Sequence, residues 1–201
     1  MEYRGKSYIS VEFRREDFME LGLTIESDYY KWDRAINIFD DRIRGRFLDQ
    51  IENLTKDNDL MRDGFSIMAL NCLLIETLLQ FKNGWDQTPS GRNKIEYKKF
   101  LKEEFPEIFY NDKTAKLFYE DIRCGILHSA QTKNRSKLTF GQEHIVKLEE
   151  DNQVIVVDVI KITDAILNYY DMYKNIIRDN MNFRLRENFL NKMMYICIRS
   201  N

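Results

Sequence analysis

The stretch from Phe65 to Phe81 restricts the fold of this chain more than any other segment. Apolar residues occupy nearly its whole helical circumference, and neither proline nor glycine interrupts it. A helix that is apolar on almost all sides must be covered by other elements, so this one predicts the central helix of a bundle. Only two prolines occur in the 201 residues, and their scarcity favours long helices elsewhere too. The sequence therefore predicts a mainly all-α fold.

Further helices are predicted where apolar residues recur every three or four positions. They span residues 32–54, residues 92–104, a segment from a cap at Asn111 or Asp112 to His128, a segment capped by Thr163, and residues 183–197. Two β-rich stretches, 144–148 and 154–159, flank a turn at Asp151 and Asn152, which predicts a β-hairpin insertion over 138–160. We interpret residues 1–30 as an irregular lead-in, 181–199 as a C-terminal helix, and 1–201 as one helical domain.

Composition limits the partners and the compartment. The formal net charge of −2 provides no global basic field for nucleic acid, so such binding must be local. The local basic stretches, including Arg42, Arg44 and Arg46, are interpreted as solvated faces balanced by acidic residues. The three cysteines form no C-x-x-C pair and predict buried thiols in a reducing compartment. With no signal-like N-terminus and no apolar run of membrane length, we expect a cytoplasmic protein with no membrane contact.

Most catalytic and metal-binding motifs are absent from the sequence. There is no phosphate-binding glycine loop, no H-E-x-x-H helix and no G-x-S-x-G elbow, and two histidines without cysteine pairs do not predict a metal site. What remains is Arg123 and His128 at the end of a predicted core helix. At 100° per residue from Ile122, Arg123 lies about 100° to one side and His128 about 120° to the other. Both would then lie off the apolar stripe and face a partner or a substrate.

The R-x4-H spacing, at the end of a core helix in a small helical bundle, resembles the HEPN superfamily of ribonucleases and toxins, whose motif is R-x4-6-H. The resemblance covers about Phe65 to Arg178 and implies a HEPN-like antiparallel bundle that forms a homodimer. It further implies that the arginine and histidine of two subunits meet at the dimer interface and cleave RNA without a metal or other cofactor. The family frequently has asparagine or aspartate after its arginine, whereas this chain has Cys124.

The chemistry of these two residue types suits RNA cleavage. Arginine presents a planar, permanently charged fork to a phosphodiester, and histidine side chains in general titrate near neutrality and transfer protons. Lys133, Asn134 and Arg135 follow the motif and are predicted to hold the RNA backbone. By the same resemblance, such proteins act in bacterial toxin–antitoxin or phage-defence systems, where an antitoxin or other protein partner is expected.

Glu76 is a further candidate, because it lies among leucines on the most apolar helix and a carboxylate there needs a partner. One interpretation is that Glu76 pairs with Arg123 and positions it for catalysis. The other is that it bonds to a tyrosine or another core group without a catalytic role.

Three alternatives to the ribonuclease remain open at this point. Arg123 could be a surface ion-pair residue and His128 a helix C-terminal cap. The same bundle could be a non-catalytic module that binds a protein or a nucleotide. Cys124 and His128, four residues apart, could form a nucleophile pair, although no orienting residue is identifiable. His144 is interpreted as a surface residue on the hairpin.

Overall fold

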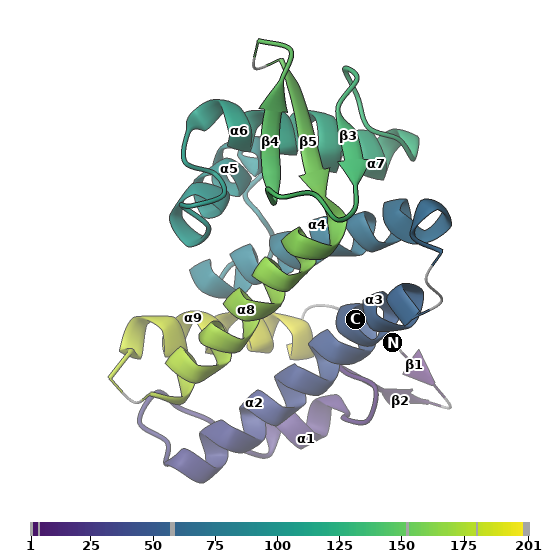
Figure 1. Ribbon diagram of the computed structural model, residues 1–201. Helices are drawn as coiled ribbons and strands as arrows, with labels where there is room; N and C mark the ends of the chain where they lie inside the picture. Colours follow the sequence, from purple (N-terminus) through teal and green to yellow (C-terminus); the bar gives the residue numbers. More distant parts are fainter. Residues whose placement is uncertain (1, 4, 57–58, 152, 180, 199–201) are drawn as a thin grey trace. The chain divides into compact units, whose positions relative to one another are not determined.

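The computed structural model describes residues 2–3, 5–56, 59–151, 153–179 and 181–198, and it divides into two compact units. Unit 1 comprises residues 1–52, 80–87 and 171–201, and unit 2 comprises residues 53–79 and 88–170. Both units are mainly helical, as predicted (Figure 1). We expected one domain. The chain passes between the units inside three helices and once in the loop at residues 87–88, and no change of composition marks these points in the sequence.

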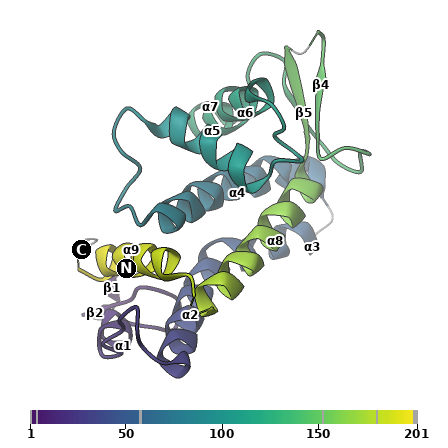
Figure 2. The ribbon, with the colours of Figure 1, turned by 90° about the vertical axis from the view of Figure 1, so that its left-hand side faces the viewer.

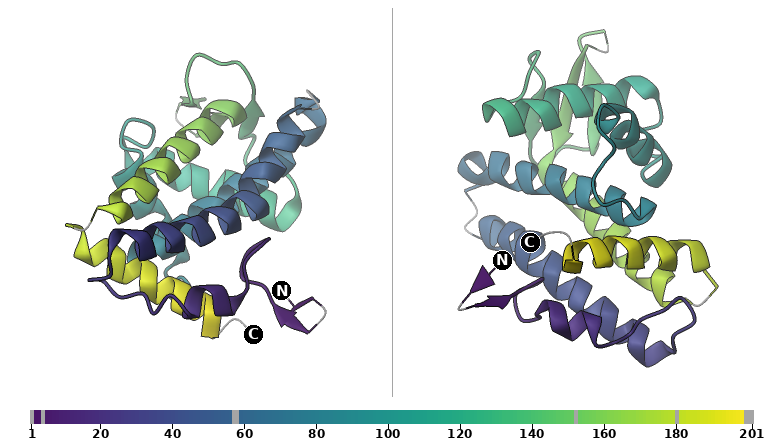
Figure 3. Two further views of the ribbon diagram at one scale, coloured as in Figure 1. Left: turned by 90° about the horizontal axis from the view of Figure 1, so that it is seen from below. Right: turned by 180° about the vertical axis from the view of Figure 1, so that it is seen from behind.

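Unit 1 is built around aromatic residues from three separate stretches of the chain. Its elements are β1 (Glu2–Tyr3), β2 (Lys6–Ser7), α1 (Arg15–Met19), α2 (Tyr29–Ile43), the π-helical η1 (Arg44–Leu48), the first half of α3 (Asp49–Lys56) and α9 (Phe183–Ile198). The ring of Phe39 lies 4.6 Å from that of Phe81 and 5.5 Å from that of Phe189, which joins α2 to α9 (Figure 3). Residues 1–30, predicted to be an irregular lead-in, contain the antiparallel pair β1–β2 and the short helix α1.

Unit 2 packs shorter helices and a small sheet against α4 (Leu60–Asn83) (Figure 2). The helices are α5 (Asn93–Glu104), α6 (Asp112–Leu117), the π-helical η2 (Phe118–Arg123), α7 (Cys124–Ser129) and the first part of α8 (Val159–Arg178). Ile67, Cys72 and Ile75 of α4 are completely covered, whereas Phe65 and Leu73 are exposed, so the helix is buried on one side and not on almost all sides as predicted. The segments α6, η2 and α7 form one continuous helical run along the chain.

The sheet of unit 2 has three strands in the order β3 (Lys137–Thr139), β5 (Val154–Asp158), β4 (Val146–Glu149). β4 and β5 are antiparallel, which confirms the predicted hairpin. β3 pairs in parallel with β5 and was not predicted. Glu150 and Asp151 of the turn have φ angles of 50° and 52°, while Asn152 lies outside the described residues. His144 lies in the loop before β4 rather than on a strand, and it is exposed as expected.

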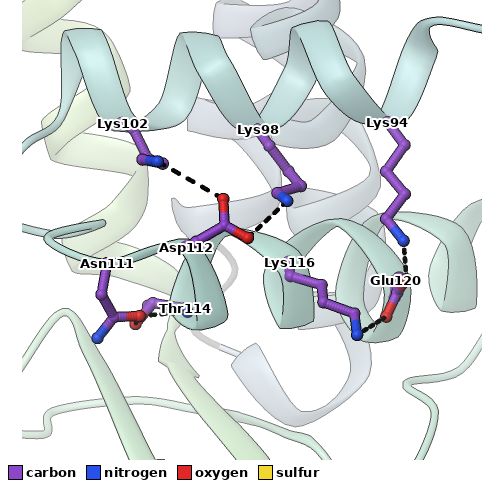
Figure 4. Close-up of polar contacts among 8 residues, drawn as sticks. All are labelled: Lys94, Lys98, Lys102, Asn111, Asp112, Thr114, Lys116 and Glu120. Carbon is purple, nitrogen blue, oxygen red and sulfur yellow. Dashed lines mark hydrogen bonds and ion pairs between the residues drawn. The ribbon is translucent and has the colours of Figure 1, made fainter.

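Helix caps agree with the sequence at one position and differ at another. Asn111 caps α6 through a hydrogen bond of 2.8 Å from the Thr114 amide, as predicted (Figure 4). Thr163 was predicted to cap the next helix and does not. Helix α8 begins at Val159, directly after β5, and the Asp158 carboxylate accepts hydrogen bonds from the amides of its first turn. Thr163 is inside the helix, where its hydroxyl donates to the Val159 carbonyl.

Ion pairs connect α5 to the α6–η2 run, as Figure 4 shows. The Asp112 carboxylate lies 2.8 Å from Lys98 Nζ and 3.5 Å from Lys102 Nζ, and Lys94 pairs with Glu120. The basic side chains of α5 are thus balanced by acidic residues of the neighbouring helix, as expected for a solvated face.

Among the described residues, one helix is long and apolar enough to cross a membrane. It is α4, which corrects the expectation that no apolar run reaches that length. Of its apolar window, 56% is buried inside the protein, and the core helix of a soluble bundle meets the same criteria of length and composition. Helix α4 is therefore weak evidence for a membrane span.

Candidate functional site

The residues of the R-x4-H motif lie at the junction of two helix types. Arg123 is the last residue of η2, and His128 lies in the last turn of α7. In η2 the backbone hydrogen bonds skip one residue more than in an α-helix, so side chains occupy different angles from those expected at 100° per residue. Segments of this kind occur frequently at functional sites. The angular prediction for Arg123 therefore does not describe its actual environment.

Arg123 points toward α4 and pairs with Glu76. Arg123 Nη2 lies 2.6 Å from Glu76 Oε2, and the two side chains are 12% and 19% exposed. The other carboxylate oxygen, Oε1, lies 3.4 Å from the Thr88 hydroxyl, which donates to it. The ion pair was one of our two interpretations of Glu76, and the structure contains it. Arg123 is therefore not the exposed side chain that the helical wheel predicted.

The electrostatics of this pair favour the charged guanidinium. Burial lowers the pKa of Arg123, but the hydrogen bond to Glu76 and the negative charge of that carboxylate outweigh it and raise the pKa above its ordinary value. The Arg123 carbon Cζ also lies 5.5 Å from the centre of the Tyr119 ring. Burial raises the pKa of Tyr119, so this hydroxyl is neutral at physiological pH.

The guanidinium keeps unused hydrogen-bonding capacity. Nε of Arg123 is buried and has no hydrogen-bond partner among the described residues, and Nη1 contacts only the Cys124 sulfur, at 4.0 Å. A buried donor without a partner is costly, and such a group is often explained by a missing water, ion or ligand. Glu76 thus holds the guanidinium of Arg123 through Nη2, while Nε has no described partner and Nη1 contacts only sulfur.

His128 has the opposite environment. Its side chain is exposed, and within the described part of the chain it makes no hydrogen bond or ion pair with another residue. Helix α7 ends directly after it, where Ala130 takes a left-handed conformation with φ 53°. The imidazole is therefore accessible to a substrate or to a second protein molecule.

The loop after α7 is fastened to η2 by a buried carboxylate. Asp121 is 0% exposed, and it accepts hydrogen bonds from Asn134 Nδ2 at 2.8 Å and from the Ser136 hydroxyl at 2.9 Å. The backbone amide of Lys133 donates to the Asp121 carbonyl at 3.0 Å. The loop also approaches α7 closely, since a Cβ built on Gly125 would lie 2.5 Å from the Gln131 carbonyl oxygen. The loop is thereby held rigidly beside the motif.

The three residues predicted to hold RNA differ in their environments. The Asn134 side chain is occupied by Asp121, so it serves the loop's own structure. Arg135 is exposed and forms an ion pair of 2.8 Å with Glu150 of the hairpin turn. Lys133 has an exposed side chain, and its described contact is made by the backbone. Lys133 is therefore an exposed cation of this loop with no ion pair among the described residues.

Sequence reasoning missed Asp121, Thr88 and Tyr119. Asp121 could have been noticed, because it lies next to Ile122 of the apolar stripe, where an aspartate needs partners. Thr88 lies in the loop after α4, and nothing in its sequence context relates it to Glu76. Within the described residues, no group of three or more histidine, cysteine, aspartate or glutamate side chains could hold a metal ion.

Comparisons with other proteins do not extend this picture. No protein-family model matches the chain, and neither the curated proteins nor the solved structures give a match. The relation to the HEPN superfamily therefore remains an expectation that depends on Arg123, His128 and the helical surroundings described above.

Proposed function

We propose that this protein is a metal-independent endoribonuclease of the HEPN type. The observation that supports the proposal is the contrast within one helical run: Glu76 holds the Arg123 guanidinium in place, and His128 is exposed and unpartnered among the described residues. A fixed cation suits charge stabilisation at a phosphate, and an accessible imidazole suits proton transfer.

In the proposed reaction, His128 accepts the proton of an RNA 2′-hydroxyl. The 2′ oxygen then attacks the adjacent phosphorus, and the bond from phosphorus to the 5′ oxygen breaks. The leaving 5′ oxygen takes up a proton, which gives a 2′,3′-cyclic phosphate and a 5′-hydroxyl end. Arg123 stabilises the negative charge on the phosphate, and Lys133 attracts the neighbouring backbone.

This reaction needs a base and an acid, whereas each chain supplies one histidine in the motif. A homodimer related by a two-fold axis would supply both, because an isologous interface brings the same surface of two subunits together. The exposure of His128 is compatible with such an interface. We accordingly include homodimerisation in the proposal, along with a role in a bacterial toxin–antitoxin or phage-defence system.

The test is cleavage of a fluorescent RNA by the purified protein in excess EDTA. We expect cleavage that survives chelation, products with 2′,3′-cyclic phosphate ends, and a rate at least about 10²-fold lower for His128→Ala. His144→Ala is the matched control, since His144 is the other histidine of the chain and is also exposed. It should keep the full rate.

Arg123→Lys keeps the positive charge and removes the planar guanidinium, so it should also lower the cleavage rate. Circular dichroism checks that the variant is folded. If no RNA is cleaved under any condition, the proposal fails, and a non-catalytic module that binds a protein or a nucleotide takes its place. If cleavage is lost in Cys124→Ala and retained in His128→Ala, a thiol mechanism replaces the one proposed.

A further inference from the structure

Two arginine side chains of unit 1 converge on one backbone carbonyl. Arg42 of α2 and Arg46 of η1 both donate hydrogen bonds to the Ile9 carbonyl oxygen, and the bond from Arg46 Nη2 is 3.4 Å long. The Ile9 segment packs closely on this helical run, because a Cβ built on Gly45 would lie 2.1 Å from Val11 Cγ2. The shared acceptor therefore holds the two guanidinium groups next to each other.

A third cation of unit 1, Lys192, is influenced by the charge of Arg42. Lys192 of α9 is 6% exposed, and its ammonium donates to Gln80 Oε1 at 2.8 Å and to the Asp86 carbonyl oxygen at 2.6 Å, both neutral acceptors. Burial and then the positive charge of Arg42 lower the pKa of Lys192 to about 8, and the Asp86 carboxylate opposes this more weakly. Burial and the charge of Arg46 lower the pKa of Arg42 to about 10. The charge of Arg46 thus acts on Arg42, and the charge of Arg42 acts on Lys192.

No ion pair among the described residues compensates this cluster, although the Asp86 carboxylate acts weakly on Lys192. Within the described part of the chain, no carboxylate lies within ion-pair distance of Arg42, Arg46 or Lys192. Acidic residues of neighbouring segments are paired elsewhere: Glu16 with Arg15, Asp40 with Lys174, and Asp49 with Arg44. Gathering like charges costs free energy unless an anion compensates them, and the cost is largest for the buried Lys192 and smallest for the exposed Arg46. The cluster therefore has the charge and the unused donors of an anion site.

We propose that Arg42 and Arg46 bind a phosphate dianion, either inorganic phosphate or the terminal phosphate of a nucleotide, with Lys192 supplying a third positive charge. Each guanidinium has five N–H donors in a plane and shares a single described acceptor, so donors remain for phosphate oxygens. A dianion matches three clustered cations better than a phosphodiester, which carries one charge. The inference does not rest on the proposed ribonuclease, because His128 belongs to unit 2.

The test uses the two tryptophans, Trp32 and Trp85, which both belong to unit 1 and report its unfolding by fluorescence. We expect inorganic phosphate, titrated at constant ionic strength with chloride, to raise the thermal midpoint in a saturable way. Arg46→Gln should weaken phosphate binding at least about tenfold, because one charged hydrogen-bonding partner is lost. Arg46 is exposed, so this variant is expected to fold.

Arg44→Gln is the matched control. Arg44 lies in the same π-helical segment, but its guanidinium pairs with Asp49 at 3.0 Å and Glu52 at 3.6 Å. It should leave phosphate binding unchanged. ATP and an RNA oligonucleotide with a 5′-hydroxyl form two further arms, and binding of ATP but not of the RNA assigns the site to terminal phosphates. The proposal is overturned if phosphate leaves the midpoint unchanged, if Arg46→Gln binds as well as the wild type, or if only the RNA binds.

Discussion

A partly buried carboxylate–guanidinium pair such as Glu76–Arg123 reflects two opposing free energies. Removing water from both charges is costly, and their mutual attraction in a low dielectric repays that cost only while both partners are present. Removing one partner therefore costs more than the pair contributes as a whole. Because Arg123 Nε already lacks a described partner, the guanidinium depends on Glu76 more than an exposed arginine would.

Glu76→Gln is expected to lower the free energy of unfolding by about 1–3 kcal/mol, since it leaves the covered guanidinium without a counter-charge. The measurement is urea unfolding followed by far-ultraviolet circular dichroism. The control is Glu103→Gln, because Glu103 pairs with Lys99 at 3.8 Å in an exposed position and should cost less than about 0.5 kcal/mol. Equal losses in the two variants would contradict the role assigned to Glu76.

At the scale of elements, strand β5 passes into helix α8 without a loop, and Asp158 makes this possible. Its Oδ1 accepts hydrogen bonds from the amides of Ile160 and Lys161, and its Oδ2 accepts one of 2.8 Å from the Gln142 amide. The carboxylate is 1% exposed. It thus satisfies the first turn of the helix and fixes the segment that leads from β3 to β4.

Asp158→Ala is expected to cost about 2–3 kcal/mol of unfolding free energy, because three partly buried amide donors lose their acceptor. Asp28→Ala is the comparison, since Asp28 caps α2 in an exposed position with one hydrogen bond of 3.0 Å from Lys31, and it should cost about 1 kcal/mol. Chemical unfolding of both variants measures the difference. An Asp158 variant that loses no more than the Asp28 variant would show that burial and bond number do not determine the cost.

The same elements show what periodicity can and cannot predict. The long helices and the β4–β5 hairpin were predicted because their patterns extend over many residues. Strand β3 has three residues and pairs with β5 across the hairpin, so no local pattern marks it. The π-helical segments η1 and η2 are too short for their own period to be visible. The sequence predicted Thr163 as the cap of α8 because Asp158 lies in a β-rich stretch, where an aspartate is expected to belong to the strand.

At the scale of the whole chain, only some residues of the candidate site were singled out from the sequence. Arg123, His128 and Glu76 were identified from one sequence, because each is an unusual residue in its local context. Asp121 and the cation cluster of unit 1 were not, because their significance comes from contacts between residues that are distant along the chain. Arg42 and Arg46 in particular were interpreted as a solvated face. They share the Ile9 carbonyl, whereas Arg44 pairs with Asp49 and Glu52.

The buried ammonium of Lys192 makes the stability of unit 1 depend on pH. Its pKa is about 8 in the folded protein and 10.5 for an ordinary lysine, so between these values the unfolded state binds more protons than the folded state. Stability therefore rises with pH across this window, and the charged form penalises folding below it. We expect the unfolding free energy of the wild type, relative to Lys192→Met, to increase by on the order of 1–2 kcal/mol from pH 8 to pH 10.

Tryptophan fluorescence during urea unfolding in phosphate-free buffer measures this difference, because both tryptophans lie in the unit that contains Lys192. Lys192→Met also loses the hydrogen bonds to Gln80 and Asp86, but that loss shifts the whole curve and leaves its slope with pH unchanged. Lys99→Met, at an exposed position, should keep the wild-type slope. Parallel curves for the wild type and Lys192→Met would mean that this ammonium titrates as it does in water, and that burial does not control its charge.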